Sequence, residues 1–317
     1  MNLPATSVTH LCDSYGVLLR RDAVLCGVDD KALARLVDAG VLVKLRHGAY
    51  CLRAVYLAAD RAERHRLLCR AVMKQYADHV ALSHASSCVV QGGPEYGLDL
   101  GRAHITHLTG GGRPTLRLRH HLGECRVNDL RRQHGHWLTT PARAVLEVAT
   151  SDGVEASLVQ ANHFLHAEET TLDHLRQCFE TQTFWPNSLR QHPVLLLAEP
   201  KVESVGESRC SYAFFAQGLS RPEPQFEVIY PDGTVAARVD FAWPHRGVIV
   251  EFDGREKYHR FRKQNETLEE MVMREKARED LIRRLTGWTV VRVVWNDLDH
   301  PVHLANRIRR AMAGLAA

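Results

Sequence analysis

The stretch VIVEFDG, residues 248–254, decides the fold and the chemistry expected of the C-terminal part of the chain. Its first three residues are apolar and β-branched, which favours a buried strand, and Gly254 ends the run. Because side chains alternate along a strand, Glu251 and Asp253 point to one face and Phe252 to the other. Two neighbouring carboxylates repel each other and are costly to remove from water. A divalent cation between them would relieve both costs, so the stretch predicts half of a metal site.

The strands that precede this stretch supply the other half of the predicted site. Residues 226–230 and 235–243 have strand patterns and are separated by the turn PDG, so they form an antiparallel meander with residues 248–254. Asp240 then lies on the strand next to Glu251. Magnesium binds through one or two carboxylates with water and substrate phosphate. The pair, with Glu207 from the preceding helix, therefore predicts a site for Mg²⁺ or Mn²⁺.

The composition and length of the chain restrict the classes of protein to which it can belong. The chain has 317 residues, of which 45% are hydrophobic and 25% charged, and this length suggests two or three domains. It has no apolar run long enough to span a bilayer and no signal-peptide pattern at its start. The eight cysteines contain no CxxC pair and read as reduced thiols, so we expect a cytoplasmic protein without a membrane partner. The net charge of +4 permits nucleic-acid binding only through a local basic surface.

Residues 1–54 predict a winged helix-turn-helix, that is, short helices followed by a β-hairpin. The expected elements are helices over Val8–Tyr15 and Arg20–Cys26, a third helix capped by Asp29 or Asp30 and ended by Gly40, and strands over 41–45 and 49–52. Lys31 and Arg35 on the third helix, with Lys44 and Arg46 on the wing, would face duplex DNA. The alternative is a module that binds protein through a solvated charged face.

Residues 55–185 predict a middle α/β domain in which we expect no catalytic constellation. Strands over 103–108 and 116–120 flank the loop TGGGR, which indicates a hairpin or a flexible connection rather than a phosphate cradle. His120, His121 and Cys125 could ligate a metal, but a fourth ligand is missing and the spacing fits no common zinc module. We therefore interpret these three residues as structural.

Residues 186–317 predict the third domain. The expected order is a helix over 207–217, the three strands, a long helix capped by Thr267 and ended by Gly287, a strand over 288–295 and a closing helix over 302–315. The order α-β-β-β-α-β is the common core of one nuclease superfold. The whole chain is thus expected to be a mixed α/β (α+β) protein.

Several segments of this third domain resemble known nucleases. Asp240 with the EFD of residues 251–253 resembles the PD-(D/E)XK signature, and Glu207 matches the helical acid of that family. The agreement extends to VDFAWP (239–244), VEFDG (250–254), KY (257–258), EKARED (275–280) and GWTVVR (287–292), which resemble the actinobacterial branch of the very-short-patch-repair-like endonucleases. The resemblance implies a restriction-endonuclease-like fold and a Mg²⁺- or Mn²⁺-dependent DNA endonuclease, a phosphodiester hydrolase of phage defence or DNA repair.

One position departs from the nuclease motif. Asp253 stands where the family has lysine, so Lys257 or Lys276 would have to supply the positive charge, and Asp253 could be a further metal ligand. The alternative is a domain that binds metal poorly and only holds DNA. His259 could act as general acid or base, or could equally be an exposed loop histidine.

The first two thirds of the chain resemble AbiEi-type antitoxins, through the winged helix and through LSHAS (82–86) and LTTPAR (138–143). This resemblance implies binding to operator DNA by the first domain and toxin neutralisation by the second. Two hypotheses follow. One is a metal-dependent endonuclease brought to double-stranded DNA by the winged helix, with RNA as a weaker alternative substrate. The other is an antitoxin and transcriptional regulator whose nuclease-like domain is inactive and binds DNA, a partner or a second copy in a homodimer.

Overall fold

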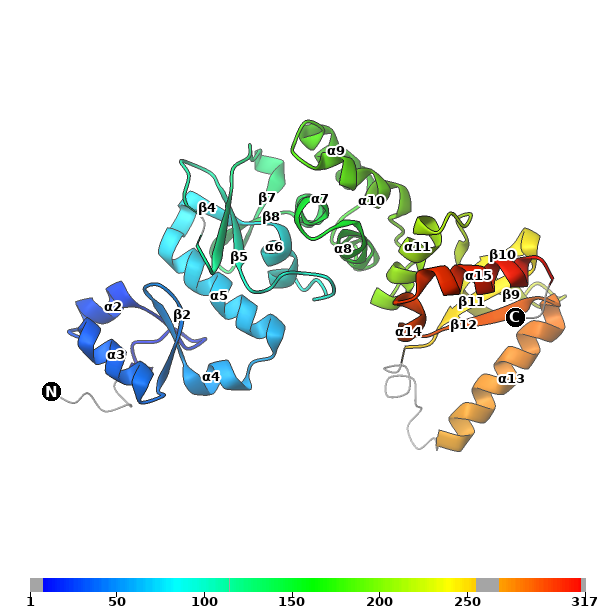
Figure 1. Cartoon of the computed structure of the whole chain (residues 1–317), viewed down its shortest axis with the longest axis horizontal. Coiled ribbons are helices and arrows are strands. Elements are labelled where there is room, and N and C mark those ends of the chain that lie inside the picture. The colour runs from blue at the N-terminus through cyan, green and yellow to red at the C-terminus, as the bar shows by residue number, and fades with distance from the viewer. Residues whose placement is uncertain (1–7, 114, 255–267, 315–317) are drawn as a thin grey trace. The chain divides into compact units, whose positions relative to one another are not determined.

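The computed structural model describes residues 8–113, 115–254 and 268–314. The chain forms two compact units (Figure 1). Unit 1 comprises residues 1–164 and 168–196, and unit 2 comprises residues 165–167 and 197–317. No helix within the described ranges combines the length and the apolar character needed to cross a membrane.

Unit 1 begins with a small helical region closed by a three-stranded sheet. Its elements are β1 (Val17–Leu19), α2 (Arg20–Leu25), α3 (Asp30–Asp38), β2 (Leu42–Arg46) and β3 (Ala49–Leu52), and the strand order is β1-β3-β2. The predicted hairpin is confirmed, since β2 and β3 pair antiparallel. The predicted cap is confirmed as well, because the Asp29 side chain accepts a hydrogen bond from the Ala32 N–H at 2.7 Å.

The first predicted helix, Val8–Tyr15, is wrong beyond Thr9. The Asp13 carboxylate accepts hydrogen bonds from the backbone N–H groups of Tyr15 (3.0 Å) and Val17 (2.9 Å), which turns the chain into β1. The sequence pattern had not predicted this strand.

Helices α4 (Arg53–Ala58) and α5 (Arg61–Tyr76) connect the first region to the next. The apolar side chains of α5, such as Leu67 and Val72, share one core with Leu19 and Cys51 of the first sheet and with strands of the second. The first and middle regions are therefore held in one unit by a common core around α5.

The middle region is built on a five-stranded sheet of order β6-β5-β4-β8-β7. Its strands are β4 (Val80–Leu82), β5 (Ala103–His107), β6 (Leu118–His121), β7 (Leu130–Gln133) and β8 (His136–Thr139). Strands β5 and β6 pair in parallel, so the predicted hairpin at TGGGR is wrong. The glycines allow a close crossing instead, because a Cβ at Gly112 would lie 2.4 Å from the His120 ring.

The other helices of unit 1 come after β4 or after β8. They are α6 (His84–Val90), α7 (Pro141–Ser151), α8 (Val154–His166), α9 (Leu172–Gln182) and α10 (Gln191–Leu197). Helix α10 contains Pro193, which fits there because a proline in the first turn of a helix removes no intrahelical hydrogen bond.

Among its described residues, unit 2 has the element order α-β-β-β-α-β, with two helices after the last strand. The elements are α11 (Val205–Ala216), β9 (Glu223–Ile229), β10 (Val235–Trp243), β11 (Val248–Phe252), α13 (Leu268–Thr286), β12 (Thr289–Val293), α14 (Trp295–Leu298) and α15 (Pro301–Met312). The sheet order is β12-β11-β10-β9, and only β11 and β12 are parallel among these pairs. Residues of α11 and α15 pack on one face and Ile282 of α13 on the other.

In unit 2, the last strand ends earlier than predicted, and the predicted cap of the long helix is not described by the structure. The last strand ends at Val293 rather than at residue 295, because the Asp297 carboxylate accepts a hydrogen bond from the Val294 N–H at 2.9 Å and begins α14. Thr267, the predicted cap of the long helix, lies outside the described residues.

Candidate functional site

The predicted DNA-contacting helix, α3, presents its basic residues to solvent. Leu33 and Leu36 anchor its inner face in the core, whereas Lys31 and Arg35, one turn apart, are exposed. The neighbouring Asp30 is neutralised by Arg20, whose guanidinium donates two hydrogen bonds to it at 2.5 and 2.6 Å. Asp29 and Asp38, at the two ends of α3, are also exposed, so Lys31 and Arg35 provide local positive charge without making the whole face basic.

The two wing residues differ in their surroundings. Lys44 is exposed, but Arg46 is partly buried, donates a hydrogen bond to the Gln75 side chain and lies 5.8 Å from the centroid of the Tyr76 ring. Arg46 thus attaches the wing to α5, and only Lys44 of the pair is presented to solvent.

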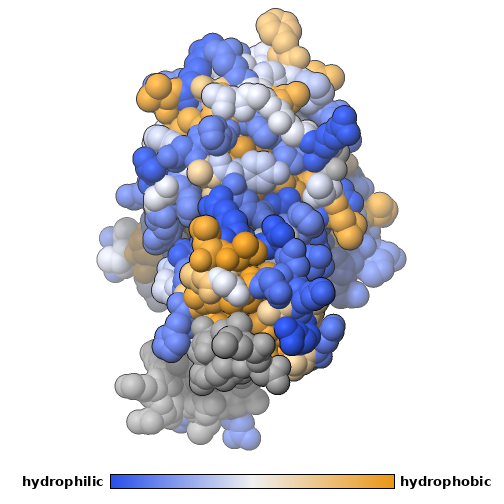
Figure 2. All heavy atoms as spheres, turned by 90° about the vertical axis from the view of Figure 1, so that its left-hand side faces the viewer, coloured by the Kyte–Doolittle hydropathy of each residue, from blue (hydrophilic) through white to orange (hydrophobic). Residues whose placement is uncertain are grey.

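The surface around α2 and α3 is not uniformly charged. Figure 2 shows hydrophobic side chains among hydrophilic ones on this side of unit 1. The exposed fractions of Val24 and Leu25, on α2, are 45% and 85%. Any contact with a nucleic acid would therefore depend on a small number of cations rather than on a broad basic surface.

In unit 2 the predicted acids lie where strands β10 and β11 begin to diverge. The pairing runs from Trp243↔Val248 to Phe241↔Val250, and the next residue along each strand is Asp240 and Glu251. The Asp240 carboxylate accepts a hydrogen bond from the Phe252 N–H at 2.7 Å. At this point β10 also changes the core that it faces, since Val239 packs on the α13 side and Phe241 on the α11 side.

Glu251 and Asp253 each have an arginine beside them. Arg278 of α13 lies 2.6 Å from Glu251 and also donates a hydrogen bond to the Arg238 carbonyl at 2.7 Å. Arg292, opposite Glu251 in the parallel register, approaches Asp253 at 3.8 Å. Arg278 was not among the site residues predicted from the sequence, although it belongs to the quoted EKARED segment.

Of the two lysines proposed to replace the missing motif lysine, the structure describes only Lys276, and it lies away from the acids. Lys276 is exposed on α13, two residues from Arg278 and so on another side of the helix. Lys257 and His259 lie outside the described residues.

Glu207 is buried at the start of α11. Its carboxylate accepts hydrogen bonds from the Ser204 hydroxyl (2.6 Å), the Glu203 N–H (3.1 Å) and the Gln225 amide (3.0 Å). It therefore forms part of the helix cap. Burial raises the pKa of the Cys210 thiol, and the charges of Asp240 and Glu207 raise it further, so both acids lie near this one side chain.

A cavity of about 660 Å³ opens beside this helix cap. Its lining carries charges of both signs, from Lys201, Glu203, Glu223, Glu227 and Arg238. Gln225, which contacts Glu207, is also part of the wall.

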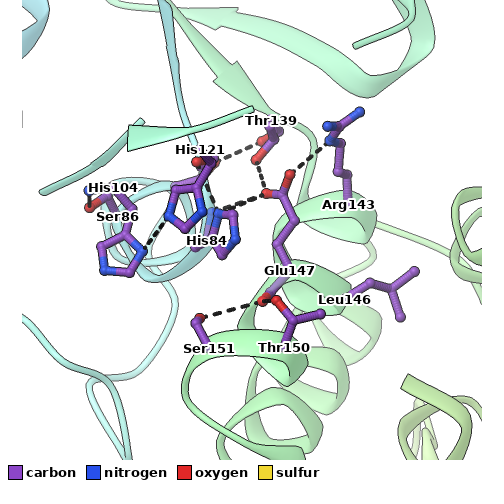
Figure 3. Close-up of polar contacts among 12 residues, drawn as sticks. His84, Ser86, His104, His121, Thr139, Arg143, Leu146, Glu147, Thr150 and Ser151 are labelled. Atoms are coloured by element: carbon purple, nitrogen blue, oxygen red, sulfur yellow. Dashed lines mark hydrogen bonds and ion pairs between the residues drawn. The ribbon is translucent and has the colours of Figure 1, made fainter. Parts of the chain in front are cut away.

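The middle region of unit 1 holds a second polar site, which the sequence analysis did not predict (Figure 3). Arg143 donates hydrogen bonds from Nε to Glu147 (2.8 Å) and from Nη1 to Asp129 (2.7 Å), and its guanidinium lies 4.9 Å from the Trp185 ring centroid. Burial alone would lower the pKa of Arg143, but Glu147 and Asp129 raise it above its ordinary value. The available signal was an Arg and a Glu four residues apart on an otherwise apolar helix.

Three histidines meet beside this charged network. His84, His104 and His121 come from the start of α6, from β5 and from β6, and each offers a nitrogen within 4.8 Å of the other two. Burial lowers the pKa of all three, that of His121 to about 4. Across the described ranges, this is the group of three or more His, Cys, Asp or Glu side chains that has the spacing of metal ligands.

Comparison with known proteins identifies the N-terminal region. Residues 9–53 match the family model described as "Transcriptional regulator, AbiEi antitoxin". The match covers α2, α3 and the β2–β3 hairpin. Residues 9–53 are thus similar to the N-terminal region of AbiEi-type regulators. No curated protein matches the chain.

The match confirms the AbiEi resemblance for the first domain. The AbiEi resemblance of the middle domain and the nuclease resemblance of unit 2 stay predictions.

Proposed function

We propose that this protein is a DNA-binding transcriptional regulator of the AbiEi antitoxin type. The observation that carries the proposal is the match of the regulator family to residues 9–53, which include α3 and the hairpin. Exposed Lys31 and Arg35 on α3, with Lys44 on the wing, supply phosphate contacts of the kind that position a helix in the major groove. The family name also brings a toxin into the proposal as protein partner.

Fluorescence anisotropy tests the DNA contact. The probe is a labelled duplex from upstream of the protein's own gene, with a shuffled duplex of the same composition as competitor. The double variant Lys31→Ala/Arg35→Ala should bind on the order of tenfold more weakly, and the salt dependence of log K should fall by about one for each lost phosphate contact. Arg176→Ala, which removes an exposed arginine of α9, is the matched control.

Unchanged affinity in the double variant, with the same salt slope, would refute α3 as the DNA-contacting element. Loss of affinity in the control alone would move the interface to another part of unit 1. Toxin binding is tested separately, by co-purification of the full chain with the product of an adjacent gene.

A second candidate is a metal-dependent endonuclease in unit 2. It is favoured by the element order α-β-β-β-α-β and by the adjacent positions of Asp240 and Glu251 on neighbouring strands. The described residues fit Mg²⁺ poorly, because Arg278 holds Glu251 and the Phe252 N–H holds Asp240. Each contact uses one carboxylate oxygen, but the Arg278 guanidinium neutralises Glu251 and so weakens the attraction of this pair for a cation, and the regulator remains the main proposal.

Plasmid nicking distinguishes the two candidates. Supercoiled plasmid is incubated with the full chain and Mg²⁺ or Mn²⁺, beside Asp240→Ala and Glu251→Ala. A regulator leaves the plasmid intact under both metals. Nicking that disappears in both variants would establish the nuclease instead.

A further inference from the structure

The three imidazoles of His84, His104 and His121 form a compact group of neutral nitrogen ligands inside unit 1. Nδ1 of His104 and Nε2 of His121 face each other at 3.2 Å. Two nitrogens bound at about 2.0–2.1 Å to one tetrahedral zinc ion are about 3.3–3.4 Å apart, so this pair already has the separation of two ligands. The third nitrogen lies within 4.8 Å, a distance that closes by a shift on the order of 1 Å.

The backbone of His84, one member of this group, has an uncommon conformation. Its φ is +52°, a left-handed conformation that residues with a side chain rarely adopt. The Glu147 carboxylate holds it there by accepting the His84 N–H at 3.1 Å. The ring stacks on that of His121, with centroids 3.6 Å apart and planes at 18°, so the His84 ring must turn out of this stack before its in-plane lone pair reaches an ion shared with His121.

Side chains around His84 also orient its ring. Nδ1 lies 3.0 Å from the Ser83 hydroxyl and 3.6 Å from Glu147 Oε2, which leaves Nε2 as the nitrogen free to bind an ion. Metal-binding histidines in proteins usually have their second nitrogen hydrogen-bonded to such a carboxylate or oxygen. Glu147 is in turn held by the Thr139 hydroxyl (3.1 Å) and by Arg143, so its position is fixed (Figure 3).

From these contacts we propose that unit 1 binds a divalent transition-metal ion of the Zn²⁺ class through His84, His104 and His121. Three imidazoles suit zinc, cobalt or nickel rather than magnesium, which prefers oxygen. Three protein ligands leave the fourth tetrahedral position to a water molecule, the arrangement of open rather than closed zinc sites. His121 is partly exposed, and this provides the side from which an ion enters. The site does not depend on DNA binding by α3 or on the acids of unit 2.

The same strands offer a matched control pair. His107 and His120 stack with centroids 5.0 Å apart, and Nε2 of His107 lies 2.7 Å from Nδ1 of His120. Because side chains alternate along β5, His107 points to the face opposite that of His104. His107→Asn therefore removes a buried histidine from the same strand without touching the proposed ligands.

The test uses the full chain, purified without a polyhistidine tag and stripped with a chelator. Co²⁺ is titrated and followed by the visible absorption of tetrahedral cobalt, and Zn²⁺ is then titrated by calorimetry. We expect about one ion per chain, a rise in Tm on metal addition, and the same uptake in His107→Asn. His104→Asn and His121→Asn should lose uptake, and Glu147→Gln should weaken it on the order of tenfold or more.

Three results would overturn the proposal. The first is that the wild-type protein takes up no Co²⁺ or Zn²⁺. The second is that metal uptake persists unchanged in the double variant His104→Asn/His121→Asn. The third is that metal uptake is lost equally in the control His107→Asn. Far-ultraviolet circular dichroism verifies that each variant is folded. Because the wild-type titration is decisive alone, a variant that fails to fold does not rescue the proposal.

Discussion

Units 1 and 2 each contain a glutamate that is paired with an arginine, but the two pairs differ in how deeply they are buried. In unit 1 the side chains of Arg143 and Glu147 are both 1% exposed. In unit 2 those of Arg278 and Glu251 are 30% and 11% exposed. A sealed pair must be satisfied completely within the protein, because water cannot replace a lost partner. A pair open to solvent can exchange its arginine for another cation at lower cost.

This difference separates two ways of building a polar site. Around Arg143, the acids Asp129 and Glu147 share one cation and Glu147 also holds His84, so the network supports a neighbouring group. Around Arg278, the arginine itself occupies the carboxylate that a metal would need. In the site that resembles a known nuclease a protein cation thus pairs with Glu251, whereas the histidine group that resembles no common sequence motif has ligand spacing.

Arg143→Ala should have the largest effect on stability. The change leaves Glu147 and Asp129 buried without their cation, and breaking such a pair costs about 3–5 kcal/mol. The free energy of unfolding of unit 1 is measured by urea denaturation. Arg176→Ala, which breaks an exposed pair with Asp173, is the control and should cost less than about 1 kcal/mol. Equal losses in the free energy of unfolding of the two variants would mean that the buried network contributes no more to stability than an exposed ion pair.

Acid should destabilise unit 1 through His65 on α5, which is not one of the proposed metal ligands. Its Nδ1–H donates to the Leu100 carbonyl (3.0 Å) and its Nε2 accepts from the Ser86 hydroxyl (2.9 Å). Burial lowers the pKa of His65 from 6.5 to about 4. Below pH 6.5 the His65 side chain therefore becomes protonated in the unfolded chain, whereas in the folded protein it stays neutral down to about pH 4.

The stability contributed by neutral His65 is complete above pH 6.5 and is lost as the pH falls to 4, a change of about 3 kcal/mol. Denaturation of wild type and His65→Gln at pH 7 and pH 4.5 measures it. The variant should lose less stability between the two pH values than wild type does. The exposed His192→Gln should behave as wild type, and a slope unchanged in His65→Gln would show that other groups carry the acid sensitivity.

Of these variants, Arg278→Ala should have the smallest effect on stability. It tests the more exposed of the two Arg–Glu pairs, the one in unit 2. Because Arg278 is partly exposed, its loss should cost about 1 kcal/mol. The more informative measurement is Mn²⁺ affinity by calorimetry, which should rise in this variant if Asp240 and Glu251 form a latent metal site. Arg283→Ala, which breaks the pair with Glu279, is the control. Mn²⁺ binding that stays absent in Arg278→Ala would leave unit 2 without a metal role.

Much of the architecture could be predicted because it depends on local periodicity. The α3 cap at Asp29, the β2–β3 hairpin and the order of elements from α11 to β12 all follow from spacing within short windows. The short-range hydrogen bonds of Asp13 and Asp297, which redirect the chain at both ends, were overlooked because a single acidic side chain overrode an otherwise regular pattern.

By itself the sequence determined the AbiEi-type first domain and the neighbouring positions of Asp240 and Glu251, because each lies within a continuous run of residues. Only the tertiary structure decided which cation holds each acid and which histidines meet. Arg278 reaches Glu251 from another helix, and His84, His104 and His121 come from three elements joined by a parallel pairing that the glycine loop permits. Contacts of this kind depend on how sheets and helices pack, which local periodicity does not specify.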